Sequence, residues 1–247
     1  MEQKPWIEGS LEILELAIEQ YYMSISSDTR RDSNRYLRVA LINTDDAVEL
    51  AMKAFTQYQT GQFASRKFHS TLTWIKKNGP SLGISLPKGF EGKIRYYHNT
   101  RGTLYHQGYS LRISRLEVLD YIAKAIILFR LLFKEDLERS FESNPRRLFL
   151  LSCPELEKQV IDLASMNRIV VNEEIDIEDI IQSLIKKEVV EEDIYETFNE
   201  MTTILDRITP QRESLSKIGD IYEPARIISE SILKLRDSVK RSSKRRK

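Results

Sequence analysis

The sequence predicts an all-α protein, because its apolar residues recur at helical spacing and its strand signals are weak. In successive stretches of the 247-residue chain, apolar residues return every three or four positions. Residues that start or stop helices stand between those stretches, such as Ser114 with Glu117 and the break at residues 143–145. Residues 169–172 form a candidate extended piece, but no other segment pairs with it obviously. We therefore expect a helical bundle with at most two short strands.

The first expected helix starts at Ser10, which can cap it. Its apolar residues recur at spacings of three and four and form one buried stripe, made of Leu11, Leu14, Ile18, Tyr22 and Ile25. Residues 26–34 are polar and are expected to form a loop.

The second expected helix opens at residues 43–46, where Asp45 and Asp46 would occupy the first turn and face the positive end of the helix dipole. Its core stripe is expected to contain Val48, Ala51, Met52, Phe55 and Tyr58. A third helix is expected over residues 64–77, with Phe68, Leu72 and Ile75 inward and His69 beside them as a packed or solvated residue.

Chemically useful side chains concentrate in residues 93–108. This stretch holds His98 and His106, which are two of the three histidines, and also Arg95 and Arg101. An arginine is permanently charged and binds phosphate through two hydrogen bonds, whereas a histidine exchanges a proton near neutral pH. An arginine and a histidine together suffice to break a phosphodiester without a metal. For the pair Arg101 and His106 taken alone, the alternative is a solvated helix face.

The segment RGTLYHQG, residues 101–108, and the long apolar helix after it resemble the HEPN superfamily. Members of that family carry an arginine, a polar residue and, after three more residues, a histidine, between one helix and a long C-terminal helix. The resemblance is most specific over residues 96–133 and extends more loosely back to Asn43. It implies a HEPN-like helical bundle and a metal-independent endoribonuclease, with Arg101 and His106 catalytic, built where two such domains face each other.

Gly102 departs from the family pattern, in which active members usually have Asn, Asp or His after the arginine. His98 and Asn99 lie one turn or less upstream and are expected to substitute. Glycine lowers helix stability by about 1 kcal/mol relative to alanine, which predicts a local bend or a close backbone approach. Positions five apart on a helix point about 140° from each other, so such a bend would bring Arg101 and His106 onto one phosphate.

Further residues are expected to support this site or to bind RNA. The resemblance implies an acidic residue on an early helix, for which Glu49 is the candidate; the alternative is an ion pair with Lys53, four positions on. Tyr105 is a further supporting candidate. The expected RNA-binding residues are Lys93, Arg95, Lys244, Arg245 and Arg246, of which the last three belong to a basic tail at residues 241–247.

A long helix is expected from Arg115 to about Phe141, with apolar residues on more than one side. It either lies at the centre of the bundle or also packs on another subunit. The break at residues 143–145 marks the expected domain boundary, with a HEPN-like domain at residues 1–142 and a second helical domain at residues 153–240.

Helices in the second domain are expected at residues 155–166, 176–187, 191–208 and 223–240. The third has the cleanest stripe, formed by Ile194, Phe198, Met201, Leu205 and Ile208. Residues 212–219, RESLSKIG, can be laid over residues 101–108, with Lys217 in place of His106. This second domain is either a degenerate HEPN-like repeat or a chance similarity between two helix ends.

Composition narrows the classes of partner and cofactor. The 38 basic and 37 acidic residues nearly cancel, so contact with RNA must be local. Cys153 is the single cysteine, which excludes an internal disulfide and a cysteine-based metal site and fits a reducing cytoplasm. We expect no metal and no cofactor. The chain starts without a signal-peptide pattern, and its most apolar run, residues 123–133, is too short to span a bilayer, so we expect a cytoplasmic protein without membrane contact.

Two functions are therefore expected. The first is a HEPN-like ribonuclease that cleaves RNA by attack of a ribose 2′-hydroxyl. The resemblance places it in prokaryotic defence or in a toxin–antitoxin pair, as a homodimer or with a HEPN-like partner, and with a cognate inhibitor or sensor protein. The second is a non-catalytic HEPN-like module that binds protein or RNA.

Overall fold

A computed structural model of the chain describes residues 5–61, 67–107, 112–172, 176–208 and 222–244. Within these ranges the chain forms helices and no strand, which confirms the all-α class; residues 169–172 are not a strand. None of the described helices combines the length and the apolar character needed to cross a bilayer. The elements are α1 (Pro5–Ile25), α2 (Arg30–Thr60), α3 (Phe68–Asn78), the 3₁₀ helix η1 (Gly79–Leu82), α4 (Phe90–Gln107), α5 (Arg115–Ser143), α6 (Pro145–Met166), α7 (Ile177–Lys186), α8 (Asp193–Ile208) and α9 (Tyr222–Lys244).

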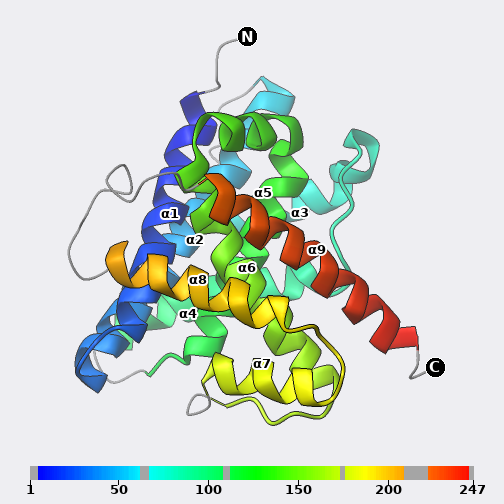
Figure 1. Cartoon of the computed structure of the whole chain (residues 1–247). Coiled ribbons are helices and arrows are strands. Elements are labelled where there is room, and N and C mark those ends of the chain that lie inside the picture. The colour runs from blue at the N-terminus through cyan, green and yellow to red at the C-terminus, as the bar shows by residue number, and fades with distance from the viewer. Residues whose placement is uncertain (1–4, 62–66, 108–111, 173–175, 209–221, 245–247) are drawn as a thin grey trace.

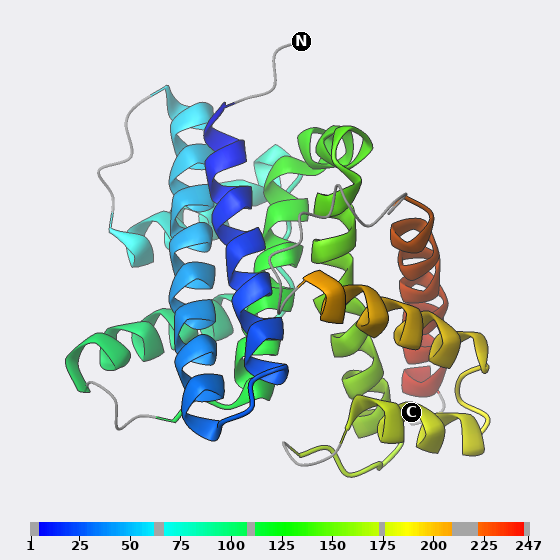
Figure 2. The same ribbon diagram turned by 60° about the vertical axis from the view of Figure 1, so that its left-hand side comes forward.

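Helix α5 lies at the centre of the molecule and packs against α1, α2, α4 and α6. Figure 2 shows α1 and α2 side by side on one side of α5 and α6, with α8 and α9 on the other side, whereas in the view of Figure 1 α8 crosses in front of α1. The broad apolar surface of α5 is buried within the chain, at Ile122, Ala125, Ile126, Leu128, Phe129, Leu132 and Phe133. Of the two interpretations for that breadth, the central position is therefore the one observed. Ser114 and Glu117 form the predicted capping box at its start.

Helix α2 begins thirteen residues before the predicted position 43, which is the largest correction to the expected elements. The side chain of Thr29 caps it by accepting a hydrogen bond from the backbone N–H of Asp32. Most of the polar run at residues 26–34 is thus the first turn of a helix and not a loop. As a result Asp45 and Asp46 lie in the middle of α2, where the helix dipole gives them no special stabilisation.

The predicted core stripes are confirmed with few exceptions. Ile25 and Tyr58 were expected inward but are 41% and 56% exposed, because each lies at the end of its helix. Ser10 is buried inside α1 and donates to the backbone carbonyl of Ile7, so it is not the cap. The third helix starts at Phe68, four residues later than predicted. Ile208 lies outside the described side chains.

The break at residues 143–145 is confirmed as a helix boundary, because Asn144 caps the start of α6. Helix α6 starts at Pro145, ten residues before the predicted position 155, and it continues without interruption through Pro154. One apolar cluster includes buried residues from α1 to α9. The division into domains at residues 1–142 and 153–240 stays a prediction, as does the repeat at residues 212–219, which lies outside the described residues.

Candidate functional site

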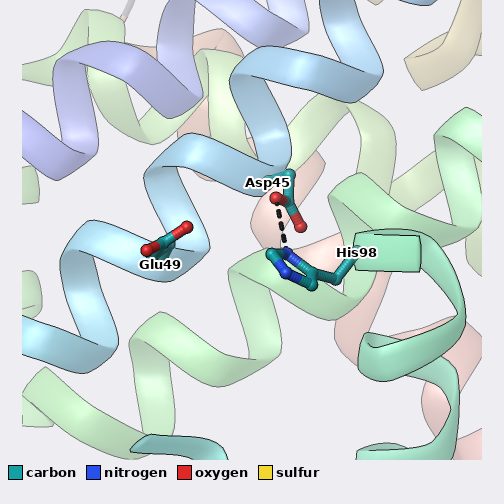
Figure 3. A group of neighbouring side chains, drawn as sticks. All are labelled: Asp45, Glu49 and His98. Atoms are coloured by element: carbon teal, nitrogen blue, oxygen red, sulfur yellow. Dashed lines mark hydrogen bonds and ion pairs between the residues drawn. The ribbon is translucent and has the colours of Figure 1, made fainter. Parts of the chain in front are cut away.

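The centre of the candidate site is the carboxylate of Asp45, which α2 presents to α4 and α5. Its side chain has no exposed surface. The Tyr121 hydroxyl donates to Oδ1 at 2.6 Å, while Nδ1 of His98 lies 2.9 Å from Oδ2 (Figure 3). Nε of Arg101 lies 3.4 Å from the same Oδ2. One buried carboxylate therefore holds the two motif-helix residues that can bind or protonate a phosphate.

Arg101 is held a second time by the neighbouring residue of α2. Its Nη2 donates to Oδ1 of Asp46 at 2.5 Å, and its guanidinium lies 5.1 Å from the ring centre of Tyr105. Burial lowers the pKa of Arg101, but the carboxylates of Asp46 and Asp45 outweigh that effect and leave its pKa raised. The side chain keeps a quarter of its surface exposed. Arg101 is thus a fixed cation that still reaches solvent.

The ring of His98 is fixed on its other face by α3. It stacks on Phe68 with ring centres 3.6 Å apart and planes 7° apart. The ring of His69 approaches edge-on at 5.3 Å, and His69 is exposed, so it is a solvated neighbour of the site. Burial lowers the pKa of His69, and the positive charges of Arg95 and His98 lower it further. We assign Nδ1 of His98 as the donor to Asp45, which leaves the other ring nitrogen as an acceptor.

Burial raises the pKa of Asp45 above its ordinary value of 3.8, even though Tyr121, His98 and Arg101 all favour the ionised form. The folded chain therefore keeps a carboxylate where ionisation is unfavourable. Buried groups with shifted pKa values concentrate at functional sites, because there the charge serves chemistry and not stability. This raised pKa, together with the contacts of Asp45, makes the cluster a candidate functional site.

Asp45, Glu49 and His98 each have a ligand atom within 4.8 Å of the other two, which is the arrangement of a small metal site. The donors are already engaged, however. Both oxygens of Asp45 accept hydrogen bonds, Nδ1 of His98 faces Asp45, and Nζ of Lys53 lies 2.6 Å from Glu49. Together with the positive charge of Arg101, these contacts favour carboxylates that are paired with basic side chains of the protein over carboxylates that bind a metal ion.

No protein-family model matches the chain, and searches of curated proteins and of solved structures find no significant match. The HEPN resemblance therefore rests on the sequence motif alone.

The structure places the backbone of His106 in the last turn of α4, while its side chain lies outside the described residues. Helix α4 continues through Gly102, and a methyl group added there would meet no atom within 4 Å. Of the two alternatives predicted at Gly102, the close backbone approach is therefore wrong, and the local bend stays a prediction. On a regular helix Arg101 and His106 are separated by about 7.5 Å along the axis.

The other predicted site residues divide into two groups. His98 and Tyr105 contact the cluster, whereas Asn99 is exposed on α4. Glu49 lies close to Asp45 and also forms the expected ion pair with Lys53.

The expected RNA-binding residues differ in their exposure and in their contacts. Lys93 is exposed, with its ammonium 5.9 Å from the Tyr96 ring centre. Arg95 is bound by Glu91 at 2.8 Å and by Thr73 at 2.7 Å, so it braces α4 against α3. The side chains of Lys244, Arg245 and Arg246 lie outside the described residues.

Four residues of the cluster were not predicted as site residues: Asp45, Asp46, Phe68 and Tyr121. A signal for Asp45 is present in the sequence, because it stands three residues before Val48 on an otherwise apolar stripe. A carboxylate on a buried helix face needs partners, and those partners are the site.

Proposed function

We propose that the protein is a metal-independent, HEPN-like endoribonuclease. The observation that carries the proposal is the buried carboxylate of Asp45, which contacts both Arg101 and His98 of α4. The resemblance implies an acidic residue of an early helix beside the motif arginine. Asp45 and Asp46 occupy that place, one turn before the expected Glu49.

In the proposed reaction, Arg101 stabilises the charge that grows on the phosphoryl oxygens. Two carboxylates hold one edge of its guanidinium, so the cation is oriented before substrate arrives, and this preorganisation is what electrostatic catalysis requires. The ribose 2′-oxygen attacks the adjacent phosphorus and loses its proton to a histidine. The bond to the 5′-oxygen breaks, that oxygen takes a proton, and the products are a 2′,3′-cyclic phosphate and a 5′-hydroxyl.

We assign the main proton transfer to His106, as the resemblance implies. Two proton-transfer groups are needed at opposite ends of an in-line displacement, one for the nucleophile and one for the leaving oxygen. Within one copy of the chain, the second proton-transfer group is His98, the other histidine of α4, which Asp45 orients through Nδ1. A second copy of α4 facing the first would supply another His106.

The pairing of two motif helices is part of the proposal, through a homodimer or a HEPN-like partner. Most of the apolar surface of α5 is buried within the chain, so we place the pairing surface on α4. Tyr105 is 59% exposed and offers apolar area beside Arg101, and Tyr96 is 48% exposed on the same helix. A setting in prokaryotic defence or as a toxin with a cognate inhibitor or sensor protein follows from the resemblance alone.

A non-catalytic RNA- or protein-binding module is the second candidate function. The observation that favours it is the ion pairing of Arg101 with two carboxylates, of which Asp46 already accepts from a donor that phosphate would need. Gly102 favours it too, since it replaces the polar residue of the active family members.

Incubation of the purified protein with end-labelled single-stranded RNA in EDTA tests the proposal. We expect cleavage in EDTA and a loss of about 100-fold or more for Arg101→Gln and His106→Ala. The matched control is Arg139→Gln, because Arg139 is an exposed arginine of α5. Tight RNA or protein binding without cleavage would support the module instead.

A further inference from the structure

A groove of about 1310 Å³ lies between the start of α2 and the residues that lead into α5. It is lined by six arginines, which are Arg30, Arg31, Arg35, Arg38, Arg112 and Arg115. Asp32 is the single carboxylate among the lining residues, and Thr29 donates a hydrogen bond to it. This concentration of positive charge contrasts with a chain whose net charge is +1.

Four of these arginines have no carboxylate partner within the described part of the chain, and all four are exposed. They are Arg30, Arg31, Arg35 and Arg112. Arg115 differs, because its Nη2 donates to the buried carboxylate of Glu157 at 2.6 Å. Unpaired like charges that face one groove repel each other and weaken the fold slightly, so their convergence is better explained by an anionic ligand.

We propose that this groove binds the phosphate backbone of single-stranded RNA next to the cleavage site, an inference that rests on the proposed function. Guanidinium groups hold phosphates through two parallel hydrogen bonds, and the start of α2 adds the positive end of a helix dipole. The groove exceeds the usual volume of a small-molecule pocket and has no aromatic side chain among its lining residues on which a base could stack. It therefore suits a linear polyanion better than a free nucleotide.

The position of the groove relative to the site supports this assignment. Arg38 and Asp45 lie seven residues apart on α2, which places them on one face about 10 Å from each other along the helix. Arg112 follows His106 by six residues, so their Cα atoms lie within about 20 Å of each other. Figure 2 shows the α1–α2 turn and the end of α4 at the same end of the molecule. An RNA strand can thus contact the groove and the Arg101 site at once.

The test measures affinity for labelled single-stranded RNA by fluorescence anisotropy, in an Arg101→Gln background so that cleavage does not interfere. The groove variant replaces Arg30, Arg31, Arg35 and Arg112 by Gln. We expect it to bind RNA at least about tenfold more weakly between about 50 and 200 mM salt. The slope of log affinity against log salt should fall by about 0.7 for each phosphate contact removed.

The matched control separates the groove from net charge. The double variant Arg31→Gln, Arg35→Gln is compared with Arg139→Gln, Arg168→Gln, which removes the same charge from exposed arginines elsewhere. Equal RNA affinity of the two double variants overturns the inference. ATP is the second probe, and binding of ATP as tight as binding of RNA would show a nucleotide site instead. Wild-type protein that binds an acidic protein but no RNA would also overturn the inference.

Failure of the groove and failure of the ribonuclease are distinguishable. A dinucleotide substrate spans the scissile phosphate but is too short to reach the groove. With Arg101 intact, the groove variant should cleave the dinucleotide at the wild-type rate and long RNA with a raised KM. Unchanged KM for long RNA would overturn the groove while leaving the ribonuclease in place. If the wild type does not cleave RNA but binds it through the groove, the ribonuclease is overturned and the groove stays in place.

Discussion

Two aspartates that bind residues of α4 or its neighbours have pKa values shifted in opposite directions. Burial raises the pKa of Asp45, and its three partners do not fully offset this effect. Burial also acts on Asp120, but hydrogen bonds from Lys124 and Tyr97 and the charges of Lys124 and Lys158 outweigh it and lower the pKa. Ionised Asp120 therefore stabilises the fold, whereas ionised Asp45 does not. We expect this difference to separate a functional carboxylate from a structural one.

Asp45→Asn should leave the free energy of unfolding at pH 7 within about 1 kcal/mol of wild type, or raise it, because the change removes an unfavourable buried charge. RNA cleavage should fall about 100-fold, since Arg101 and His98 lose their common anchor. The stabilisation by Asp45 is complete below its ordinary pKa of 3.8 and is lost as pH rises through the raised value. Urea unfolding of both proteins at pH 4 and pH 7 measures this. A loss of several kcal/mol at pH 7 would show that Asp45 is structural.

Asp120→Asn should lower the free energy of unfolding by about 2 kcal/mol at pH 7, because charged hydrogen bonds to Tyr97 at 2.5 Å and Lys124 at 2.6 Å are lost. The stabilisation by Asp120 is present above its ordinary pKa of 3.8 and is lost as pH falls through the lowered value. The difference from wild type should therefore shrink in acid, which urea unfolding between pH 3 and pH 7 detects. Cleavage at temperatures far below the melting point should stay near wild type. A difference that grows in acid would contradict the assigned pKa direction.

At the scale of elements, α4 carries the motif, and the motif contains Gly102, a glycine that lowers the stability of the helix. Gly102→Ala should raise the free energy of unfolding by about 0.5 to 1 kcal/mol, because alanine favours a helix and its methyl group meets no atom within 4 Å. Thermal unfolding and RNA cleavage of the variant are the measurements. Gly102→Asn, which restores the polar residue of the family pattern, should raise cleavage. A destabilised Gly102→Ala protein would show that α4 needs a conformation or a contact that only glycine permits.

The elements that the sequence predicts best are those with both a cap and an apolar stripe. The capping box of Ser114 and Glu117 predicts the start of α5, and the spacing of Ile194, Phe198 and Met201 predicts the buried face of α8. The start of α2 is hidden because its first turns are polar, and its first buried apolar residue is Leu37. A helix that begins with a fully solvated turn gives no apolar signal.

The residues of the candidate site on α4 could be predicted from the sequence, but their contact with the carboxylates of α2 could not. Arg101 and His98 stand three residues apart, so their shared face follows from helix geometry. Their carboxylate partner is separated from them by more than fifty residues in the sequence, and its contact depends on how α2 packs on α4. Because the helix start was placed too late, Asp45 was expected near an exposed end and not at a buried contact.

At the scale of the whole molecule, the proposal requires two motif helices in one active unit. Wild-type protein mixed and equilibrated with His106→Ala should then lose activity more steeply than the wild-type fraction. For equal amounts, about one quarter of the dimers contain two wild-type copies, so activity should fall toward one quarter if both histidines are needed. Cleavage rate and solution mass are measured on the same mixtures. A fall to one half with a monomeric active species would contradict the paired site.

The central claim, that Arg101 serves RNA cleavage by the substrate's own 2′-hydroxyl, is tested most directly by a 2′-deoxy substitution. End-labelled RNA is incubated in EDTA beside the same oligonucleotide with one 2′-deoxyribose at the cleaved position. We predict cleavage of the RNA with a 2′,3′-cyclic phosphate at the new end, no cleavage at the deoxy position, and loss of both signals in Arg101→Gln. Equal cleavage of the two oligonucleotides, or cleavage by Arg101→Gln at the wild-type rate, would contradict the claim.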